Sequence, residues 1–567
     1  MRIALAQLNT VVGDIAGNVE QIHRSLEAAA SAEADLVVFP ELTVAGYPPE
    51  DLLLRPRFAR ACEAAVDRVA REVGDFVAII GFPLWDRDLY NAAAVLSGGS
   101  RRAVYRKRFL PNYGVFDEAR YFRAGSRPLV LEFCGLRVGL TICEDIWYPT
   151  PVVSDLAAAG VDVIACLSAS PWHRDKGDAR ERMLCTRAAD AGAALAFCNQ
   201  VGGQDELVFD GRSLVCDAGG ITVARAPEFL ESLVVCDIDR QLAERRRLRE
   251  PLGRRLEPGA TPELVALDVT VTPRFGAGAT CVPPLDESEE VWRGLVTGIR
   301  DYVVKNGFGG VVIGLSGGID SALTAALAVD ALGPERVMGV TMPSRYTSDR
   351  SNDDASRLAD LLGIRFATIP IADTVASFEA ALAPVFEDAE RDVTEENLQA
   401  RTRGTLLMGI SNKHGDLVLA TGNKSEMSVG YSTLYGDMVG GFAPLRDISK
   451  TWVYRLARWR NDHAEREIIP ESTIERPPTA ELRPDQLDTD SLPPYDILDP
   501  IIEGYVESEF DVDDLVAMGH DEDTVRRVIR MIDRAEYKRR QGPVGIKVSP
   551  RAFGKDRRMP ITNGHVA

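Results

Sequence analysis

The period of the hydrophobic pattern changes repeatedly along the chain. Short apolar runs predict buried strands, which we place at 1–7, 34–39, 137–142, 311–313, 336–341, 365–370 and 417–420. Apolar residues at helical spacing predict helices, which we place at 18–30, 287–305, 321–328 and 351–362. In the second half strands and helices alternate. We therefore predict an α/β domain there, with a doubly wound parallel sheet of the Rossmann-like, nucleotide-binding kind.

The length of the chain predicts more than one domain. A single hydrophobic core rarely serves more than about 250–300 residues, and this chain has 567. A stretch rich in proline, glycine and threonine, 253–284, separates the two halves. We therefore predict a first domain at 1–250, a linker at 251–285 and a second domain at 286–567.

Composition narrows the class of protein. The formal net charge of -20 argues against nucleic acid or an anionic membrane as the main partner, because both need basic surfaces. The nine cysteines form no C-x-x-C pair, which favours free thiols in a reducing compartment. The first residues show no signal-peptide pattern, and no apolar run is long enough to span a bilayer. We expect a cytoplasmic enzyme.

The segment 311–324, VVIGLSGGIDSALT, predicts a strand, a glycine-rich turn and a helix. This arrangement aims backbone N–H groups and a helix N-terminus at an anion. The lysine of the common triphosphate loop is absent, and Asp320 precedes Ser321. That combination suits a pyrophosphate leaving group held with Mg²⁺, and hence chemistry at the α-phosphate of ATP. The predicted ATP-binding residues are Gly314, Leu315, Ser316, Gly317, Gly318, Ile319, Asp320 and Ser321.

A second polar turn that carries an acid follows the predicted strand at 417–420. It contains Thr421 and Glu426. If the two strands are neighbours, Asp320 and Glu426 would hold one Mg²⁺ together with substrate phosphate and water. The alternative is two unrelated acidic loop residues.

Three residues stand out in the first half. Glu41 lies just after a predicted strand, Lys107 lies in the segment RKRFLPNYGVFDE, and Cys143 ends the strand of GLTICEDIW. Singly they would be a loop acid, a surface lysine and a buried thiol. Together with FPEL around Glu41, these segments resemble the nitrilase or carbon–nitrogen hydrolase superfamily with its Glu-Lys-Cys triad. Phe109 stands where many relatives have histidine.

The resemblance implies a role for each of these residues. Cys143 would attack a side-chain amide as a thiolate, and Glu41 would act as general base and then protonate the ammonia. Lys107 would stabilise the oxyanion and help to keep the thiol ionised. Glu118 resembles the second glutamate that many members place near the lysine.

A longer match names a family. SASPWH and NQVGGQDELVFDG resemble the glutaminase domain of glutamine-dependent NAD synthetases. The resemblance implies a four-layer α-β-β-α nitrilase-like sandwich for the N-terminal domain, and glutamine contacts from Tyr113, Ser170 and Lys176.

The second half continues this resemblance through ENLQAR, LATGNKSEMSVGYSTLYGD, PLRDISKTWVY and the tail YKRRQGPVGIKVSPRAFGKDRRMPI. By the resemblance, Asn397, Glu426 and Lys538 would bind deamido-NAD, and Thr421 would bind ATP. Lys450 and Arg401 would contact phosphate. Residues 479–486 resemble the family's mobile segment. We expect the basic tail, 538–558, to cover anionic nucleotides, although its composition also fits an RNA-binding arm.

The family resemblance implies ATP-driven amidation of deamido-NAD to NAD, with ammonia from glutamine and with AMP, pyrophosphate and glutamate as products. Mg²⁺ would be the cofactor, the partners would be small molecules, and the chain would form a homo-oligomer. Free ammonia is mostly protonated at neutral pH, so we also expect a sealed route between two sites. A tRNA-modifying enzyme with the same ATP loop and a non-catalytic nucleotide sensor remain as alternatives.

Overall fold

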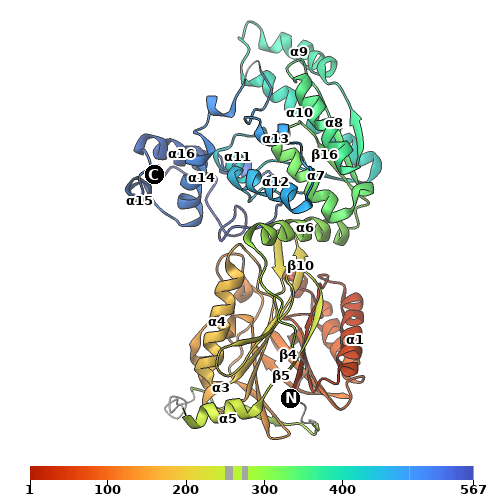
Figure 1. Ribbon diagram of the computed structural model, residues 1–567, viewed down its shortest axis with the longest axis vertical. Coiled ribbons are helices and arrows are strands. Elements are labelled where there is room, and N and C mark those ends of the chain that lie inside the picture. The colour runs from red at the N-terminus through yellow and green to blue at the C-terminus, as the bar shows by residue number, and fades with distance from the viewer. Residues whose placement is uncertain (250–258, 271–278, 484–485, 566–567) are drawn as a thin grey trace. The chain divides into compact units, whose positions relative to one another are not determined.

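The computed structural model describes residues 1–249, 259–270, 279–483 and 486–565 (Figure 1). Its internal contacts divide the chain into two compact units. The first comprises residues 1–204 and 208–286, and the second comprises 205–207 and 287–567. Much of the predicted linker, 251–258 and 271–278, lies outside the described residues. Its described part contains β15 (Glu263–Ala266), which pairs in parallel with β6 (Leu129–Phe133) of the first unit.

The first unit is built on two sheets. The first sheet has the order β14-β1-β2-β3-β4-β5, and the second has the order β13-β12-β9-β8-β7-β6-β15. The strands of the first are β1 (Arg2–Gln7), β2 (Leu36–Val38), β3 (Val77–Trp85), β4 (Leu89–Ser97), β5 (Ser100–Arg106) and β14 (Ser232–Asp237). The remaining strands of the second are β7 (Leu136–Ile142), β8 (Val163–Ser168), β9 (Ala194–Asn199), β12 (Leu214–Cys216) and β13 (Thr222–Arg225). A hairpin of β10 (Val201–Gln204) and β11 (Leu207–Asp210) forms a separate ribbon.

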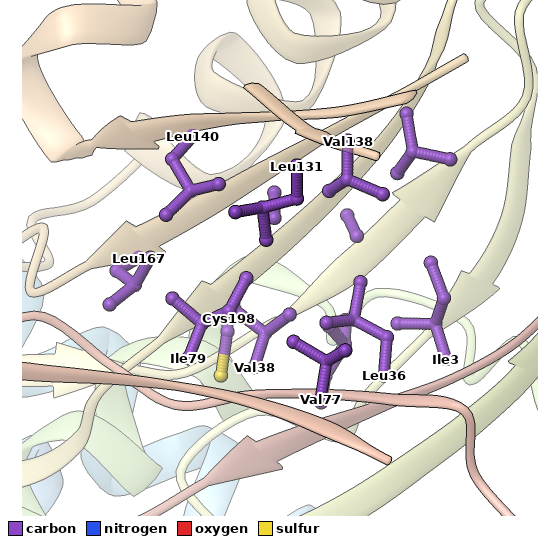
Figure 2. Packing of buried hydrophobic residues seen from close by; sticks show 14 of the residues in the cluster. Ile3, Leu36, Val38, Val77, Ile79, Leu131, Val138, Leu140, Leu167 and Cys198 are labelled. Carbon is purple, nitrogen blue, oxygen red and sulfur yellow. The ribbon is translucent and has the colours of Figure 1, made fainter. Parts of the chain in front are cut away.

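An apolar layer joins the two sheets. Figure 2 shows residues of the first sheet, such as Ile3 and Val77, facing residues of the second, such as Leu131 and Leu140, and all of them are buried. Successive residues of a strand point to opposite faces, so every second residue of these strands enters this layer. The alternate residues, such as Ala4 in β1 and Ile164 in β8, pack outward against helices.

Helices cover both outer faces. Residues of α1 (Ile15–Ser31) and α2 (Pro56–Ala70) pack on the first sheet. Residues of α3 (Ser154–Ala158) and α4 (Lys176–Ala191) belong to the apolar cluster on the outer face of the second sheet. Figure 1 shows the sheets of this unit between α1 and α4. The charged helix α5 (Arg240–Arg249) follows the last strand of the first sheet. The predicted four-layer α-β-β-α sandwich is confirmed.

The second unit contains a four-stranded parallel sheet of order β18-β17-β16-β19. Its strands are β16 (Val311–Gly314), β17 (Val337–Thr341), β18 (Arg365–Thr368) and β19 (Leu417–Leu419). The chain runs outward from β16 to β18 and then returns to place β19 on the other side of β16. This reversal confirms the predicted doubly wound sheet and places a topological switch point between β16 and β19, where ligands of such sheets collect.

Helices surround the sheet of the second unit (Figure 1). Connecting helices are α6 (Glu287–Lys305), α7 (Ile319–Leu332), α8 (Asp349–Leu362), α9 (Ala372–Phe386), α10 (Val393–His414), α11 (Lys424–Val429), α12 (Lys450–Ala464) and α13 (Glu471–Glu475). Val375 of α9 and Leu407 of α10 pack on Val312 and Val340. A separate apolar cluster belongs to helices that the hydrophobic pattern did not predict: α14 (Tyr495–Ile502), α15 (Val512–Ala517) and α16 (Glu522–Arg534). No helix among the described residues is long and apolar enough to cross a membrane.

Candidate active sites

Glu41, Lys107 and Cys143 each follow the carboxyl end of a strand in the first unit. Glu41 follows β2, Lys107 follows β5, and Cys143 follows β7 at the start of a 3-10 turn, Cys143–Ile146. The Lys107 ammonium donates to Glu41 Oε1 over 2.7 Å and to Glu118 Oε2 over 2.8 Å. All four side chains are buried. The structure therefore brings the predicted lysine and both predicted glutamates into direct contact.

The two carboxylates hold the charge of Lys107. Burial by itself would lower the pKa of this ammonium, but the charges of Glu118 and Glu41 outweigh it and raise that pKa well above its ordinary value. Burial also raises the pKa of Glu118, against the opposing effect of the Lys107 charge. The lysine is thus a fixed cation in a site closed to water.

Burial and the charge of Lys107 act in opposite directions on the pKa of the Cys143 thiol. Burial, and next the charge of Glu41, raises its pKa well above the ordinary value. Lys107 acts in the predicted direction and lowers this pKa, as does the Ser168 hydroxyl, which lies 3.5 Å from the sulfur, but both are outweighed. That Lys107 helps to keep this thiol ionised stays a prediction. Cys143 also has a φ of 44°, a left-handed conformation that fixes the side chain at this turn.

Sequence reasoning missed a group that holds Glu41. Asn91, within the buried strand β4, donates from its side-chain Nδ2 to Glu41 Oε1 over 2.7 Å. Its backbone carbonyl accepts from the backbone N–H of Lys107 over 2.8 Å. The backbone N–H of Ala169 donates to the other oxygen of Glu41 over 3.1 Å. An amide side chain among the mostly apolar residues of β4 was the signal that would have found Asn91.

Asp145 lies two residues after Cys143 in the GLTICEDIW segment, and the sequence alone did not predict its role. Its Oδ1 accepts from the backbone N–H groups of Arg108 and Phe109, over 3.0 and 2.8 Å. Its Oδ2 accepts from the Ile142 N–H over 3.0 Å and from the Tyr105 hydroxyl over 2.7 Å. One buried carboxylate thereby ties the segment after Lys107 to the turn that carries Cys143.

The three predicted glutamine contacts lie in different surroundings. The Tyr113 hydroxyl donates to both oxygens of Glu144, over 3.0 and 3.1 Å, while the tyrosine ring is exposed. Lys176, at the start of α4, donates to the Pro171 carbonyl over 2.6 Å, and its charge also lowers the pKa of Glu144, which burial raises. Ser170 is buried, and its N–H donates to Asn199 Oδ1 over 2.8 Å. Glu144, the residue after Cys143, is the group that electrostatically links Tyr113 and Lys176.

In the second unit the predicted ATP loop lies at the switch point of the sheet. β16 ends at Gly314, and α7 begins at Ile319. The loop is held by its own hydroxyls: the Gly318 N–H donates to Ser316 Oγ over 3.2 Å, and Ser321 Oγ donates to the Gly318 carbonyl over 2.9 Å. Gly317 has a φ of 77°, and a Cβ there would lie 2.4 Å from the Ser351 carbonyl oxygen. Only glycine fits this approach of the loop to α8.

A cavity of about 280 Å³ opens at this switch point. All predicted ATP-loop residues except Gly317 line it, together with Thr421 after β19. Arg403 of α10 also lines it, and burial lowers the pKa of its guanidinium to about 10. Sequence reasoning gave Arg403 no role, although it follows the ENLQAR segment in the same helix, two residues after Arg401.

Asp320 and Glu426 meet at this cavity, as β16 and β19 are neighbours. The Lys450 ammonium lies between them, 2.5 Å from Asp320 Oδ2 and 3.2 Å from Glu426 Oε1. Asn423 Nδ2 donates to the other oxygen of Asp320 over 2.8 Å. Two carboxylates that already share one cation fit the donor set that Mg²⁺ uses with substrate phosphate and water. No group of three acidic, histidine or cysteine side chains among the described residues converges to hold a metal without such help.

Two predicted deamido-NAD contacts do not line the cavity. Asn397 of α10 accepts from the Thr433 hydroxyl over 2.7 Å. The Lys538 ammonium, on α17 (Glu536–Arg539), donates to the carbonyls of Gly430 and Ser432 over 2.8 and 2.7 Å. Arg401 also lies outside the lining and donates to the Leu434 carbonyl. The structure therefore gathers the ATP loop, Thr421 and Glu426 but not these residues.

The basic tail does not cover this cavity as we expected. Several of its cations pair with carboxylates of the same unit: Lys547 lies 2.5 Å from Asp556, and Arg557 lies 3.5 Å from Asp533. None of these tail residues lines the cavity. Part of the predicted mobile segment does line it, at 479–482, while 484–485 lie outside the described residues.

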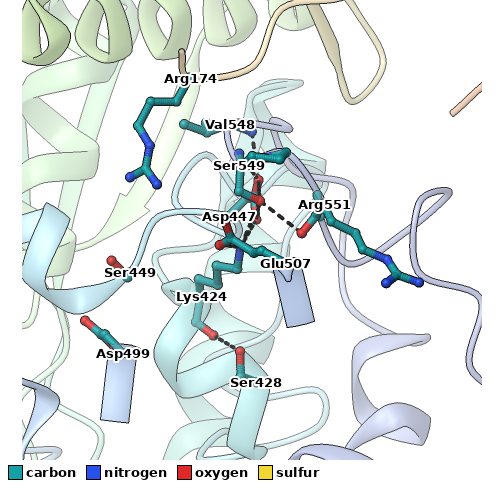
Figure 3. A network of polar contacts seen from close by, with 12 residues as sticks. Arg174, Lys424, Ser428, Asp447, Ser449, Asp499, Glu507, Val548, Ser549 and Arg551 are labelled. Carbon is teal, nitrogen blue, oxygen red and sulfur yellow. Dashed lines mark hydrogen bonds and ion pairs between the residues drawn. The ribbon is translucent and has the colours of Figure 1, made fainter. Parts of the chain in front are cut away.

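One tail residue instead fixes the turn after β19. Figure 3 shows the buried Lys424, whose ammonium lies 2.8 Å from Asp447, 2.6 Å from Glu507 and 2.8 Å from the Ser549 hydroxyl. Lys424 begins α11, the helix that also carries Glu426. Since a buried ammonium with three partners resists displacement, this network holds the start of α11 rigidly.

Comparison with known proteins finds a matching family for each of the two units. Residues 2–248 match the family model of carbon–nitrogen hydrolases, and residues 291–542 match that of NAD synthase. The chain is 49% identical to the glutamine-dependent NAD(+) synthetase of Thermotoga maritima, over 99% of this chain and 98% of that one. It is 46% identical to the enzyme of that name from Aquifex aeolicus, over 99% of each chain. The structure of the Acinetobacter baumannii enzyme with ADP superimposes with a TM-score of 0.75 at 43% identity, covering 99% of this chain and 98% of that one.

A hydrolase unit with a buried Glu-Lys-Cys group, fused to a unit with a nucleotide loop at a sheet switch point, defines a two-domain enzyme of the amidotransferase class. Such enzymes obtain nitrogen from an amide at one site and use it at another. The full-length similarity specifies the class further. The chain belongs to the family of glutamine-dependent NAD synthetases.

Proposed function

We propose that this chain forms NAD by ATP-driven amidation of deamido-NAD, with ammonia that it releases from glutamine. The observation that carries the proposal is the Lys107 ammonium held between Glu41 and Glu118, because the charges of Lys107 and Glu41 both act on the Cys143 thiol. Full-length similarity to glutamine-dependent NAD synthetases supports the substrates. A homo-oligomer, a cytoplasmic location and a sealed route for ammonia stay predictions.

At the first site Glu41 takes the proton of Cys143 when glutamine binds, and the sulfur attacks the side-chain amide carbon. The Lys107 ammonium stabilises the oxygen that becomes negative. Glu41 then returns the proton to the leaving ammonia, and water hydrolyses the thioester to release glutamate. We propose that Tyr113, Ser170 and Lys176 contact glutamine. The Glu144 carboxylate that Tyr113 holds offers a counter-charge for an amino-acid ammonium.

At the second site the carboxylate of deamido-NAD attacks the α-phosphate of ATP, and ammonia then attacks the adenylated carboxyl. The Gly314–Ser321 loop and the start of α7 line the cavity, and we propose that backbone N–H groups there would donate to phosphate oxygens, with Thr421 at the neighbouring strand end. Asp320 and Glu426 would hold Mg²⁺, which when bound supplies positive charge for the departing pyrophosphate. Lys450 also lines the cavity, and its ammonium would contact phosphate.

The contacts proposed for deamido-NAD are Asn397, Glu426 and Lys538. Of these, Glu426 lines the cavity, while Asn397 and Lys538 are bonded to neighbouring protein groups in the free structure. Their participation requires that substrate replace those bonds. Burial lowers the pKa of Lys538, so the exchange of its carbonyl partners for a phosphate would restore charge stabilisation.

The test is NAD formation from deamido-NAD, ATP and Mg²⁺, with glutamine or with ammonium, in wild type and Cys143→Ala. The variant is expected to lose glutamine-supported synthesis by at least ~10³-fold and to keep ammonium-supported synthesis. The exposed Cys134→Ala variant is the matched control and should retain both. A wild-type enzyme that makes no NAD from either nitrogen source would refute the proposed substrates.

A further inference from the structure

Two thiols outside both candidate sites face each other in the first unit. Cys185 lies on α4, and Cys216 is the last residue of β12. Their sulfur atoms are 3.3 Å apart, and both cysteines are in the reduced form. They belong to the apolar layer between α4 and the second sheet. Because one sulfur is attached to a helix and the other to a strand, the fold itself holds the two sulfur atoms near each other.

The two thiols differ in their access to solvent. Cys216 is fully buried, whereas Cys185 is partly exposed. The hydrogen bond with the Cys216 thiol lowers the pKa of Cys185, and the same contact raises that of Cys216. The partly exposed cysteine is therefore the one that more readily becomes a thiolate, and the sulfur of the buried cysteine lies 3.3 Å from it.

The surroundings of the pair limit repulsion of a thiolate. The nearest carboxylate, Glu181, accepts from the Thr222 hydroxyl over 2.8 Å and pairs with two arginines, Arg225 and Arg212. Thr222 Oγ1 also lies 3.4 Å from the Cys185 sulfur. The negative charge of Glu181 is thus offset within the cluster, and Cys185 keeps a polar neighbour beside the apolar layer.

We propose that Cys185 and Cys216 form a dithiol that peroxide oxidises to a disulfide between α4 and β12. The sulfurs must close from 3.3 Å to the bonded distance of about 2.05 Å, a movement of about 1.3 Å. Disulfides in reducing compartments are mainly transient and redox-sensing, which is the behaviour expected of such a pair.

The reaction consumes one hydrogen peroxide. The Cys185 thiolate attacks one peroxide oxygen, the O–O bond breaks, and hydroxide leaves and takes a proton to become water. The sulfenic acid formed on Cys185 is then attacked by the Cys216 sulfur. The S–O bond breaks, and hydroxide leaves with the Cys216 proton as a second water. Both sulfurs are oxidised and the peroxide is reduced, so a thiol reductant reverses the bond.

The experiment treats the full-length protein with hydrogen peroxide, blocks the remaining thiols with an alkylating agent, and maps tryptic peptides by mass spectrometry. Cleavage after arginine isolates Cys185 in 183–187 and Cys216 in 213–225, each with a single cysteine. We expect these two peptides joined by a disulfide, with equal loss of both thiols. The joined species should disappear after reduction with dithiothreitol.

Variants with one cysteine replaced show which of the two thiols is oxidised first. Cys216→Ser should stop at a sulfenic acid on Cys185, which dimedone traps, and Cys185→Ser should leave Cys216 unoxidised. The exposed Cys134→Ser variant is the matched control and should still form the joined peptides. The proposal is overturned if wild-type Cys185 and Cys216 stay reduced, if Cys185 ends as a sulfinic acid with Cys216 still free, or if either pairs with another cysteine.

Discussion

Two buried lysines of this protein each lie between two carboxylates. Lys107 contacts Glu41 and Glu118 in the first unit, at 2.7 and 2.8 Å. Lys450 contacts Asp320 and Glu426 in the second unit, at 2.5 and 3.2 Å. In both cases burial would lower the pKa of the ammonium, and the two carboxylates outweigh it and raise that pKa. The charge arrangement is the same.

Exposure separates the two clusters. The side chains of Lys107 and Glu41 are 0% exposed and that of Glu118 is 6% exposed, whereas Asp320 and Glu426 are each 18% exposed and face a cavity. A cation sealed between two carboxylates acts as a fixed charge for chemistry at a neighbouring atom. A cation at the edge of a cavity can be exchanged for another cation. Exposure to solvent, rather than residue type, therefore decides whether such a cluster is a fixed charge or an exchangeable cation site.

The largest expected effect separates the two clusters by nitrogen source. Glu41→Gln should lower glutamine-supported NAD synthesis by ~10²–10⁴-fold, because the general base is lost, and should leave ammonium-supported synthesis intact. Asp320→Asn should lower synthesis with both nitrogen sources by a similar factor and leave release of glutamate from glutamine intact. NAD and glutamate are measured in parallel.

The exposed Glu20→Gln variant on α1 is the control for these two carboxylates and should change neither product. Equal loss of ammonium-supported synthesis in Glu41→Gln and Asp320→Asn would contradict the separation of roles.

The next effect concerns stability. Lys107→Met leaves two buried carboxylates without their cation, which typically costs about 3–5 kcal/mol. Lys450→Met should cost less, because Asp320 and Glu426 are partly exposed to water. Urea unfolding followed by circular dichroism gives the shift in midpoint for each variant. A smaller shift for Lys107→Met than for Lys450→Met would argue against the sealed character of the first cluster.

A smaller effect tests exchange of the cation in the second cluster. Lys450→Met removes a positive charge that competes for Asp320 and Glu426, so Mg²⁺ should bind ~10-fold or more tightly in the absence of nucleotide. Isothermal titration calorimetry measures the affinity directly, and Lys107→Met is the matched control with wild-type Mg²⁺ affinity. The idea fails if two results occur together. Mg²⁺ would have to bind wild type and Lys450→Met with equal affinity, and it would also have to bind the double variant that carries both Lys450→Met and Asp320→Asn.

The smallest effect concerns a buried carboxylate without a close ammonium. Glu228 lies 3.7 Å from Arg212, and burial raises its pKa from 4.5 to about 7. The folded state holds this proton more tightly than the unfolded chain, so its contribution to stability is lost as pH rises from about 4.5 to about 7. Glu228→Gln should therefore gain about 1–3 kcal/mol relative to wild type between pH 5 and pH 8. Urea midpoints at both pH values measure the gain, and an equal pH dependence in both proteins would contradict it.

The sequence alone was enough to predict much of the local structure and some of the residues that meet. Helix α6 begins and ends where its spacing predicts, at Glu287 and Lys305, because the period of apolar residues encodes which face is buried. The turn after β16 needed only its glycines and Asp320 to be found. The resemblance to carbon–nitrogen hydrolases brought Glu41, Lys107 and Glu118 into one prediction.

The tertiary structure decided contacts between residues that no local pattern links. Lys450 reaches Asp320 across 130 positions, and Asn91 reaches Glu41 from the middle of an apolar strand. The surroundings of the Cys143 thiol and the pairing of the basic tail were also decided there, since burial and neighbouring charges depend on how the chain packs. A sequence period fixes which face of an element is apolar, but only packing fixes which polar groups meet across it.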